Sequence, residues 1–279
     1  MKIPIRFTKK LFNVPTRFSI AIQISPKYKI AFCPLQKSLS SILVGMICYL
    51  EHEEELKKIK NINQGWQFED LCMKEGRSTY LTGQAAKEFM NGERGGKDYL
   101  KIAIARNPVD RFLSGFSDKC SRVMNGKLHK GRDCYECNNS MECILKTLYF
   151  RSKLYLNGSL NGHVETKDEI PYIDRHLVPQ SWSCDFVHHL DDYKIIKYET
   201  EDSTNVLNEL FEIFRSRNVS EKSLENLGRR IYGKYTGHTT FLSPERIQAR
   251  DQLVKSPNML SLIRKIFHSD FQIFNFEYP

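Results

Sequence analysis

The sequence contains no apolar segment long enough to cross a membrane as a helix. Residues 10–27 are mildly apolar, but Asn13, Pro15, Arg17 and Gln23 interrupt them. The uninterrupted stretches are shorter than the roughly 18 residues that a membrane helix needs. We therefore identify neither a signal peptide nor a membrane anchor in this sequence.

Internal repeats, low-complexity tracts and long runs of lysine or arginine are also absent. The chain nevertheless carries a net charge of +9, from 42 Lys and Arg against 33 Asp and Glu, which favours anionic partners such as nucleotides, nucleic acids or acidic polysaccharides. Because the basic residues are dispersed and no RRM- or KH-type motif is present, we expect no nucleic-acid partner. With 279 residues, 41% of them hydrophobic, the chain can form one large α/β domain or two small ones.

A glycine-rich GxxxxGK[ST] phosphate loop is missing as well, which argues against an ATPase or a GTPase. A different loop, at residues 34–38, follows an apolar segment at residues 28–33 that predicts a buried strand. Residues 39–50 are apolar on nearly every side, which predicts a buried helix. A loop that leads into a helix is suited to anions, because the first backbone N–H groups of a helix are unpaired.

The side chains of this loop have a functional and a structural interpretation. Lys37 can neutralise a phosphate or sulfate group, and the hydroxyl groups of Ser38, Ser40 and Ser41 can donate hydrogen bonds to its oxygens. In the structural alternative, Ser38 or Ser40 only caps the helix and Lys37 is solvated. Taken alone, the loop favours the structural interpretation.

A second strand, turn and helix are predicted further along the chain. Residues 99–105 are apolar, and residues 109–120 have apolar side chains at helical spacing. Arg106 lies between them, where its guanidinium group can bind a phosphate through two hydrogen bonds. Ser114 shares a helix face with Asp110 and so points back toward the turn, where it can hold the same phosphate as Arg106. The alternative is a surface ion pair of Asp110 with an arginine, and a packed serine.

Strands and helices continue to alternate in the rest of the chain. A third strand is predicted at residues 192–198. Further helices are predicted at residues 85–89, 141–156, 205–215, 244–255 and 259–267. This order predicts an α/β fold with a central, mainly parallel sheet and helices on both faces. Such folds bind ligands at the carboxyl ends of their strands, so we expect both turns at one edge of the sheet.

The cysteines indicate an oxidising compartment. Their number, eight, is even, and Cys120, Cys134, Cys137 and Cys143 cluster in a polar segment. Paired cysteines in a loop are typical of disulfide bonds. A zinc site at Cys134 and Cys137 is the alternative, but no second CxxC pair or suitably spaced histidine follows. We favour disulfide bonds and leave their pairing open.

Three N-x-[ST] sequons, at Asn138, Asn157 and Asn218, also lie in polar segments. Together with the cysteines they favour the secretory pathway. A truncated N-terminus is one way to reconcile this expectation with the missing signal or anchor.

The pattern R-x-P-x-x-R-x-x-S-x-F-x-D-K over residues 106–119 closely resembles the 3′-phosphate-binding motif of the Golgi carbohydrate sulfotransferases that act on chondroitin, dermatan and related glycans. The resemblance implies that Arg106 and Ser114 bind the 3′-phosphate of 3′-phosphoadenosine 5′-phosphosulfate (PAPS). Residues 33–41 resemble the 5′-phosphosulfate loop of that family, which implies that Lys37 lies at the reactive end of the donor. It also implies a P-loop-like sulfotransferase fold, a glycan or proteoglycan acceptor, and a location in the Golgi lumen or membrane. We expect no metal.

The similarity extends from about residue 18 to the C-terminus. We therefore expect a single sulfotransferase domain at residues 18–279, with a Cys-rich insert at about 120–143, after an N-terminal segment at residues 1–17 that resembles a truncated stem. Asn107 stands where an acidic residue is usual, and the first loop is rich in serine. These departures resemble a divergent, invertebrate-like branch, and the identity of the acceptor is not carried over.

Sulfuryl transfer resembles phosphoryl transfer, in which the protein positions the group and stabilises charge. Lys37 suits the oxygen of the leaving nucleotide, and the sugar hydroxyl needs a general base. His176 is the first candidate base, since the ordinary pKa of histidine is near neutral, and Glu199 after the third strand is the second. His238 is expected in a loop over the nucleotide. The alternatives are a structural His176 and a Glu199 that pairs with Lys197.

Two other functions remain open at this level. One is a secreted glycan-binding protein of the same fold that has lost turnover, and the intact set of Lys37, Arg106 and Ser114 argues against it. The other is a nucleotide-dependent kinase, for which neither a Gly-rich loop nor ligands for Mg²⁺ can be located.

Overall fold

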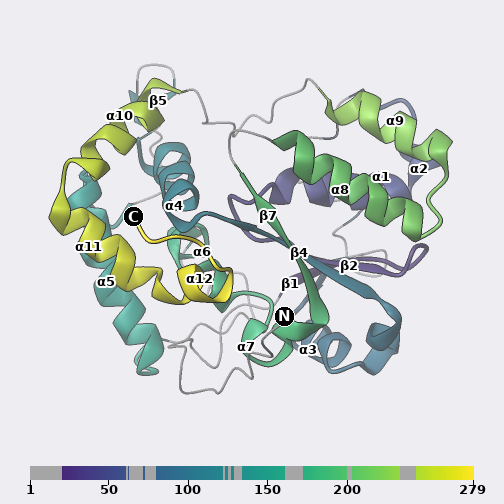
Figure 1. Ribbon diagram of the computed structural model, residues 1–279, viewed down its shortest axis with the longest axis horizontal. Coiled ribbons are helices and arrows are strands. Elements are labelled where there is room, and N and C mark those ends of the chain that lie inside the picture. Colours follow the sequence, from purple (N-terminus) through teal and green to yellow (C-terminus); the bar gives the residue numbers. More distant parts are fainter. Residues whose placement is uncertain are drawn as a thin grey trace.

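The computed structural model describes residues 21–60, 62, 72, 80–121, 123–124, 127–128, 134–160, 172–199, 203–232 and 243–279. Its centre is a five-stranded sheet with the strand order β3-β1-β2-β4-β7 (Figure 1). The strands are β1 (Ala21–Ser25), β2 (Ile30–Cys33), β3 (Tyr80–Thr82), β4 (Leu100–Arg106) and β7 (Tyr193–Tyr198).

The sheet is mixed, with its parallel strands together. β4 pairs in parallel with β2 on one side and β7 on the other, as the alternation of strands and helices predicts. β1 is antiparallel to both β2 and β3. β1 and β2 form a hairpin whose turn includes Lys29 at a positive φ of 52°. The predicted α/β fold is confirmed, and the parallel part of the sheet carries both turns of interest.

Helices cover both faces of the sheet and form a third group beside it (Figure 1). Before the Cys-rich segment these are α1 (Ser40–Glu51), α2 (Glu53–Leu56), α3 (Gly83–Met90), the 3₁₀ helix η3 (Glu93–Asp98), α4 (Pro108–Phe116) and the π-helical turn η4 (Ser117–Ser121). A small hairpin of β5 (Val123–Met124) and β6 (Lys127–Leu128) follows. The later helices are α5 (Met141–Leu156), α6 (Tyr172–Leu177), η5 (Gln180–Trp182), α7 (Phe186–His189), η6 (Leu190–Asp192), α8 (Ser203–Ser216), α9 (Glu221–Ile231), α10 (Pro244–Val254), α11 (Pro257–Ile266) and α12 (His268–Ile273).

Side-chain size differs between the two faces of the sheet. Ile102 and Ile104 of β4 point into a core shared with α1, α8 and α9. Ala103 and Ala105 point to the other face, which packs against α3 and residues near α7. Successive strand residues face opposite sides of the sheet, and both faces of β4 are buried. The sequence of β4 is therefore a continuous apolar run. A further core holds α4, α5, α6, α10 and α11 together beside the carboxyl ends of the strands.

All eight cysteines form disulfide bonds. The pairs are Cys33–Cys184, Cys48–Cys72, Cys120–Cys134 and Cys137–Cys143. The expectation of disulfides is confirmed, and the zinc alternative is wrong because the two cysteines of the CxxC sequence are bonded to different partners. No helix in the described part of the chain is long and apolar enough to span a bilayer. The three sequon asparagines are exposed.

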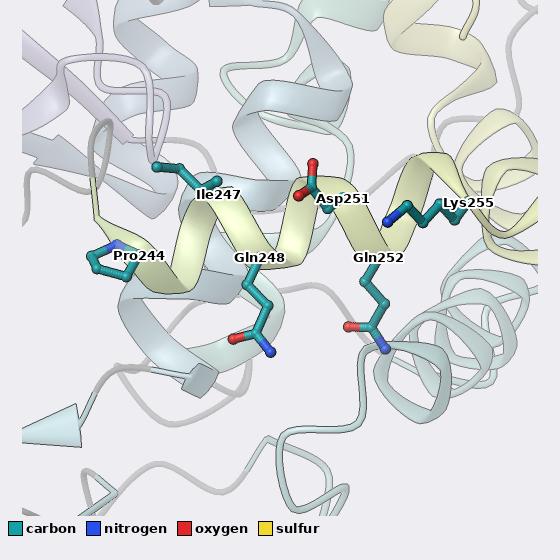
Figure 2. Close-up of a pocket in the computed structure, with 6 residues that line it drawn as sticks. All are labelled: Pro244, Ile247, Gln248, Asp251, Gln252 and Lys255. Atoms are coloured by element: carbon teal, nitrogen blue, oxygen red, sulfur yellow. The ribbon is translucent and has the colours of Figure 1, made fainter.

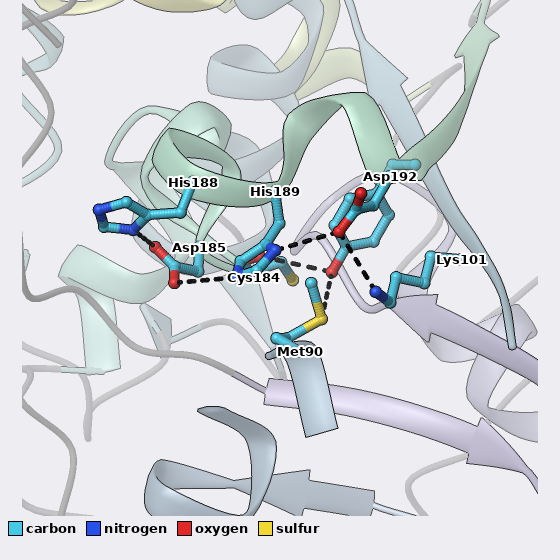
Figure 3. Close-up of polar contacts among 8 residues, drawn as sticks. Met90, Lys101, Cys184, Asp185, His188, His189 and Asp192 are labelled. Atoms are coloured by element: carbon cyan, nitrogen blue, oxygen red, sulfur yellow. Dashed lines mark hydrogen bonds and ion pairs between the residues drawn. The ribbon is translucent and has the colours of Figure 1, made fainter. Parts of the chain in front are cut away.

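Charged side chains fasten the amino ends of β4 and β7 to the segment around α7 (Figure 3). The Lys101 ammonium lies 3.3 Å from Asp192 Oδ2, which also lies 3.0 Å from His189 Nδ1. His188 Nδ1 lies 2.6 Å from Asp185 Oδ1. This network lies at the strand ends opposite the two predicted turns. It fixes the segment that begins at the disulfide-bonded Cys184.

Candidate active site at the carboxyl ends of the strands

The parallel strands bring the two predicted turns to one edge of the sheet. Arg106 ends β4 level with Tyr198 of β7, and Cys33 ends β2 level with Ala103 of β4. The loops after β2 and β4 are therefore neighbours, although the chain between them is long. The carboxyl edge of a parallel sheet is the usual ligand site of α/β folds.

The loop after β2 bends sharply before α1. Lys37 and Leu39 have positive φ values of 67° and 61°, which bulky residues rarely adopt. Leu39 is the N-cap of α1, and it provides no side-chain cap to the helix. The structural alternative, with Ser38 or Ser40 as the helix cap, is therefore wrong. Ser38 is fully buried, and its Oγ has no hydrogen-bond partner among the described residues.

The start of α1 is therefore suited to bind an anion. Its first turn contains no acidic side chain, and the N-terminus of a helix carries a partial positive charge. Ser40 is buried and Ser41 half-buried at this end. The unpaired hydroxyl group of Ser38 is the second sign of a ligand, because a buried hydroxyl group without a partner is destabilising.

Arg106 connects the two loops. Its Nη1 donates a hydrogen bond of 2.8 Å to the carbonyl oxygen of Lys37, and its guanidinium carbon lies 4.9 Å from the centre of the Tyr198 ring. Gln180 holds its backbone on both sides, with hydrogen bonds of 3.1 Å from Arg106 N and 2.7 Å to Arg106 O. Burial lowers the pKa of Arg106 to about 10, which leaves the group protonated at neutral pH.

The helix after Arg106 begins with a side-chain cap. Asn107 Oδ1 accepts hydrogen bonds from Val109 N at 2.9 Å and Asp110 N at 3.4 Å. Asparagine therefore supplies here the capping oxygen that an acidic residue also provides. Arg111 is buried, and its Nη2 donates a hydrogen bond of 2.5 Å to Val178 O.

Gly115 lies where α4 packs against α6, and Ser114 precedes it. Ser114 is 5% exposed. A methyl group at Gly115 would lie 2.8 Å from Leu177 Cδ2, 3.1 Å from His176 O and 3.8 Å from Lys37 Cγ. The absence of a side chain at Gly115 therefore lets α4, α6 and Lys37 pack together.

The Lys37 ammonium group points at the turn that ends α4. Its Nζ lies 3.0 Å from Asp118 Oδ2, and Lys119 Nζ lies 2.6 Å from the same oxygen. The three side chains are only 8%, 2% and 6% exposed. Burial lowers the pKa of Lys37 to about 8; Asp118 opposes the shift, whereas Lys119 and Arg106 add to it.

His176 of α6 adjoins this cluster. Its Nδ1 lies 2.7 Å from Tyr172 O, and because a carbonyl oxygen only accepts hydrogen bonds, Nδ1 carries the proton and Nε2 the lone pair. Burial holds the pKa of His176 well below its usual range, and the charges of Lys119 and Lys37 lower it further. The ring is therefore neutral at physiological pH.

A buried carboxylate holds α6 in place. Asp174, fully buried, accepts hydrogen bonds of 2.5 Å from the hydroxyl groups of Tyr135 and Tyr155. Arg151 completes the group with Nη2 at 2.5 Å and Nε at 2.9 Å from Asp174 Oδ2. This network anchors the helix that carries His176 to α5 and to the Cys-rich segment.

The other predicted site residues are not in this cluster. Glu199 follows β7 at the same sheet edge, but it is exposed and its side chain makes no hydrogen bond or ion pair within the described part of the chain. The alternative pairing of Glu199 with Lys197 is absent there, since Lys197 Nζ donates to Asn275 O at 2.6 Å. His238 lies outside the described residues.

Residues 21–277 match the Sulfotransferase family. The chain belongs to this family. It is 31% identical over 275 residues to uncharacterized protein C18B2.2 of Caenorhabditis elegans, covering 97% of this chain and 72% of that protein. It is 27% identical over 273 residues to carbohydrate sulfotransferase chst-1 of the same organism, covering 96% of this chain and 79% of that protein. No solved structure matches the chain.

Two further residues adjoin the candidate site, although the sequence did not single them out. Gln180 is fully buried, and its backbone N donates to Asp270 Oδ2 at 2.9 Å, so one chain of hydrogen bonds runs from α12 to Arg106. Arg246 of α10 binds Asp110 at 2.6 Å, and its charge acts on Arg106. These partners are distant in sequence, and no local pattern marks them.

A surface hollow along α10 is separate from this cluster (Figure 2). It is lined by Pro244, Ile247, Gln248, Asp251, Gln252 and Lys255, all from one helix. In Figure 2, Gln248 and Gln252 extend to the opposite side of the helix from Ile247 and Asp251. None of the predicted site residues lines it, so the sheet edge remains the candidate active site.

Proposed function

We propose that this sulfotransferase moves a sulfuryl group from PAPS to a hydroxyl group of a glycan. The observation that carries the proposal is the hydrogen bond from Arg106 to the Lys37 carbonyl, which joins the two loops that resemble the 5′-phosphosulfate and 3′-phosphate motifs. The family supports sulfuryl transfer. The relative chst-1, named a carbohydrate sulfotransferase, supports a glycan as acceptor.

The residues present fit the two anionic ends of PAPS. At one end, α1 offers backbone N–H groups without a side-chain cap, and the unpaired hydroxyl group of Ser38 lies in the same loop as Lys37. Ser40 and Ser41 are further candidate donors at this end. At the other end, Arg106 and Ser114 would hold the 3′-phosphate, because a guanidinium group and a hydroxyl group both donate to phosphate oxygens.

In the proposed reaction, the acceptor hydroxyl oxygen forms a bond to sulfur while the bond from sulfur to the phosphate oxygen breaks. PAPS supplies the activated sulfuryl group, and the phosphate oxygen retains the electron pair. Lys37 stabilises the negative charge that develops on this oxygen. His176 Nε2, which has the lone pair, accepts the proton of the hydroxyl group.

The low pKa of His176 is consistent with this role. It arises from burial and from the positive charges of Lys119 and Lys37. An anionic donor beside these lysines offsets their charge, and a nearby negative charge raises the pKa of a histidine. His176 therefore becomes a stronger base when the donor is bound. We rank Glu199 second, because it is exposed and makes no contact with Lys37 or His176 among the described residues.

Charge, disulfide bonds and sequons support a class of acceptor and a location. A net charge of +9 suits an acidic polysaccharide of the chondroitin type. Four disulfide bonds and exposed sequon asparagines support the secretory pathway, and the Golgi within it.

The test is transfer of labelled sulfate from PAPS to a panel of desulfated glycans, with chondroitin and dermatan included. We expect transfer by the native protein and a loss of about 10²- to 10³-fold in Lys37→Ala, the usual effect of removing one charge-stabilising group. Arg106→Ala should weaken binding of 3′-phosphoadenosine 5′-phosphate by about 10- to 100-fold. Lys222→Ala, at an exposed position on α9, is the matched control.

Two results would contradict the proposal. Transfer at the native rate by Lys37→Ala refutes the mechanism. Binding of PAPS without transfer to any glycan of the panel favours the glycan-binding alternative.

A further inference from the structure

The end of α4 turns two successive charged side chains inward. Asp118 and Lys119 lie in the π-helical turn Ser117–Ser121, and both are buried. On an α-helix, successive side chains point about 100° apart, so a neighbouring pair rarely faces the same interior. A π-helical turn, with hydrogen bonds between residues five apart, contains more residues per turn than an α-helix and is frequent at functional sites. Here it directs both charges toward Lys37.

One carboxylate oxygen serves two ammonium groups. Asp118 Oδ2 lies 3.0 Å from Lys37 Nζ and 2.6 Å from Lys119 Nζ. Lys119 is held in addition over the Tyr172 ring, with its Nζ 5.4 Å from the ring centre. Asp118 therefore fixes the direction of the Lys37 side chain against a wall formed by η4 and α6.

The titratable and charged groups around Lys37 come from three described elements. Asp118 and Lys119 belong to η4, Arg106 to β4, and the neutral His176 to α6. Asp118 is the anion among these four groups. Its carboxylate favours the charged form of Lys37, whereas the charges of Lys119 and Arg106 oppose it.

We propose that Asp118 is a positioning residue of the transfer site, which keeps Lys37 protonated and aimed at the sulfuryl end of the donor. The inference rests on the proposed function in assigning the donor, but the Lys37–Asp118 pair itself is independent of it. Lys119 has the opposite effect on Lys37, because the two like charges share one carboxylate oxygen.

The size of the effect follows from the pKa of Lys37, which is about 8. At pH 7, roughly nine-tenths of the lysine is then protonated. Removal of an opposite charge at this distance lowers a lysine pKa by about 1 to 3 units. The protonated fraction at pH 7 then falls to about half or less. Acidic pH restores it.

The experiment compares Asp118→Asn, Lys119→Met and the native protein by measuring kcat/KM for PAPS between pH 5.5 and 9. Activity needs protonated Lys37, so it declines as pH rises through the pKa of that group. We expect this decline to move toward acidic pH by about 1 to 3 pH units in Asp118→Asn, so that activity rises as the pH is lowered toward 5.5. In Lys119→Met it should move toward alkaline pH. Asp98→Asn, at the exposed last residue of η3 before β4, should leave the profile unchanged.

A second readout does not depend on turnover. Competitive acetylation with acetic anhydride at several pH values, read by mass spectrometry of the Lys37 peptide, reports the titration of Lys37. Compared with the native protein, we expect acetylation of Lys37 to begin at lower pH in Asp118→Asn and at higher pH in Lys119→Met. This readout also tests the pair if the native protein transfers nothing from PAPS, which would refute the proposed function alone.

Unchanged pH profiles and acetylation in both variants, with an active native protein, would overturn the inference. If Asp118→Asn does not fold, the double variant Asp118→Asn/Lys119→Met, which removes both members of the buried ion pair, is compared with Lys119→Met. We expect the decline of the double variant at more acidic pH, because the two differ only in the Asp118 charge. A shift in the wrong direction in either variant also overturns it.

Discussion

Replacement of Gly115 by alanine tests how closely α4 must approach α6 beside Lys37. The new methyl group would lie 2.8 Å from Leu177 Cδ2 and 3.1 Å from the backbone oxygen of His176. The Leu177 side chain can move aside, but the backbone oxygen moves only with α6. We therefore expect α6, and His176 with it, to shift away from Lys37 by a few tenths of an ångström.

Two opposing contributions set the change in stability. Alanine is better than glycine inside a helix by about 1 kcal/mol, whereas overpacking at a buried contact costs about 1 to 3 kcal/mol. The free energy of unfolding of Gly115→Ala should therefore fall by about 0 to 2 kcal/mol. Activity should fall more, since a displacement of about 1 Å at a site can lower rates about 100-fold. For the smaller shift expected here, we predict a loss of kcat on the order of 10-fold.

Gly228→Ala on α9 is the matched control. A methyl group there would lie 3.2 Å from Tyr232 Cε2, the ring of an exposed side chain that can rotate away. We expect this variant to gain up to about 1 kcal/mol of stability and to keep native activity. Urea denaturation and the sulfate-transfer assay measure both quantities. Native kcat in Gly115→Ala, or an equal loss in both variants, would refute the reasoning.

Two further predictions concern the support of the site. Asp174→Asn removes a buried charge that two tyrosines and an arginine bind. The free energy of unfolding, measured by urea denaturation, should therefore fall by roughly 2 to 4 kcal/mol. A decrease in this free energy smaller than that of a surface variant contradicts the prediction. Loss of the Cys33–Cys184 bond, which spans 151 residues, should cost about 5 kcal/mol by chain entropy, against about 2 kcal/mol for the Cys137–Cys143 bond, which spans 6. Paired cysteine-to-serine variants measured by thermal unfolding test this order, and the reverse order contradicts it.

Most elements of the parallel core could be predicted from the sequence. The strand predicted at residues 99–105 is β4, and the helix predicted at 141–156 is α5 with the same bounds. Both have long, regular apolar patterns, which are the strongest local signal. β1, with five residues, and β3, with three, were not predicted, because short strands have too few positions to show a pattern. α9 was also missed, since its apolar side chains are few among charged ones.

The sequence by itself determined the residue types of the site and the local form of each turn. An apolar strand, a basic residue and a helix follow one another at Lys37 and again at Arg106, and neighbouring residues alone specify this. Tertiary structure decided which turns meet. The pairing of β2 with β4 brought the loop of Lys37 to the end of β4, where Lys37 meets Asp118, 81 residues away. The packing of η5 against α12 held Gln180 against Arg106, 74 residues away. It also selected one disulfide pairing of eight cysteines, because only the fold brings Cys33 to Cys184. Contacts between distant segments depend on strand order and burial, which no local pattern encodes.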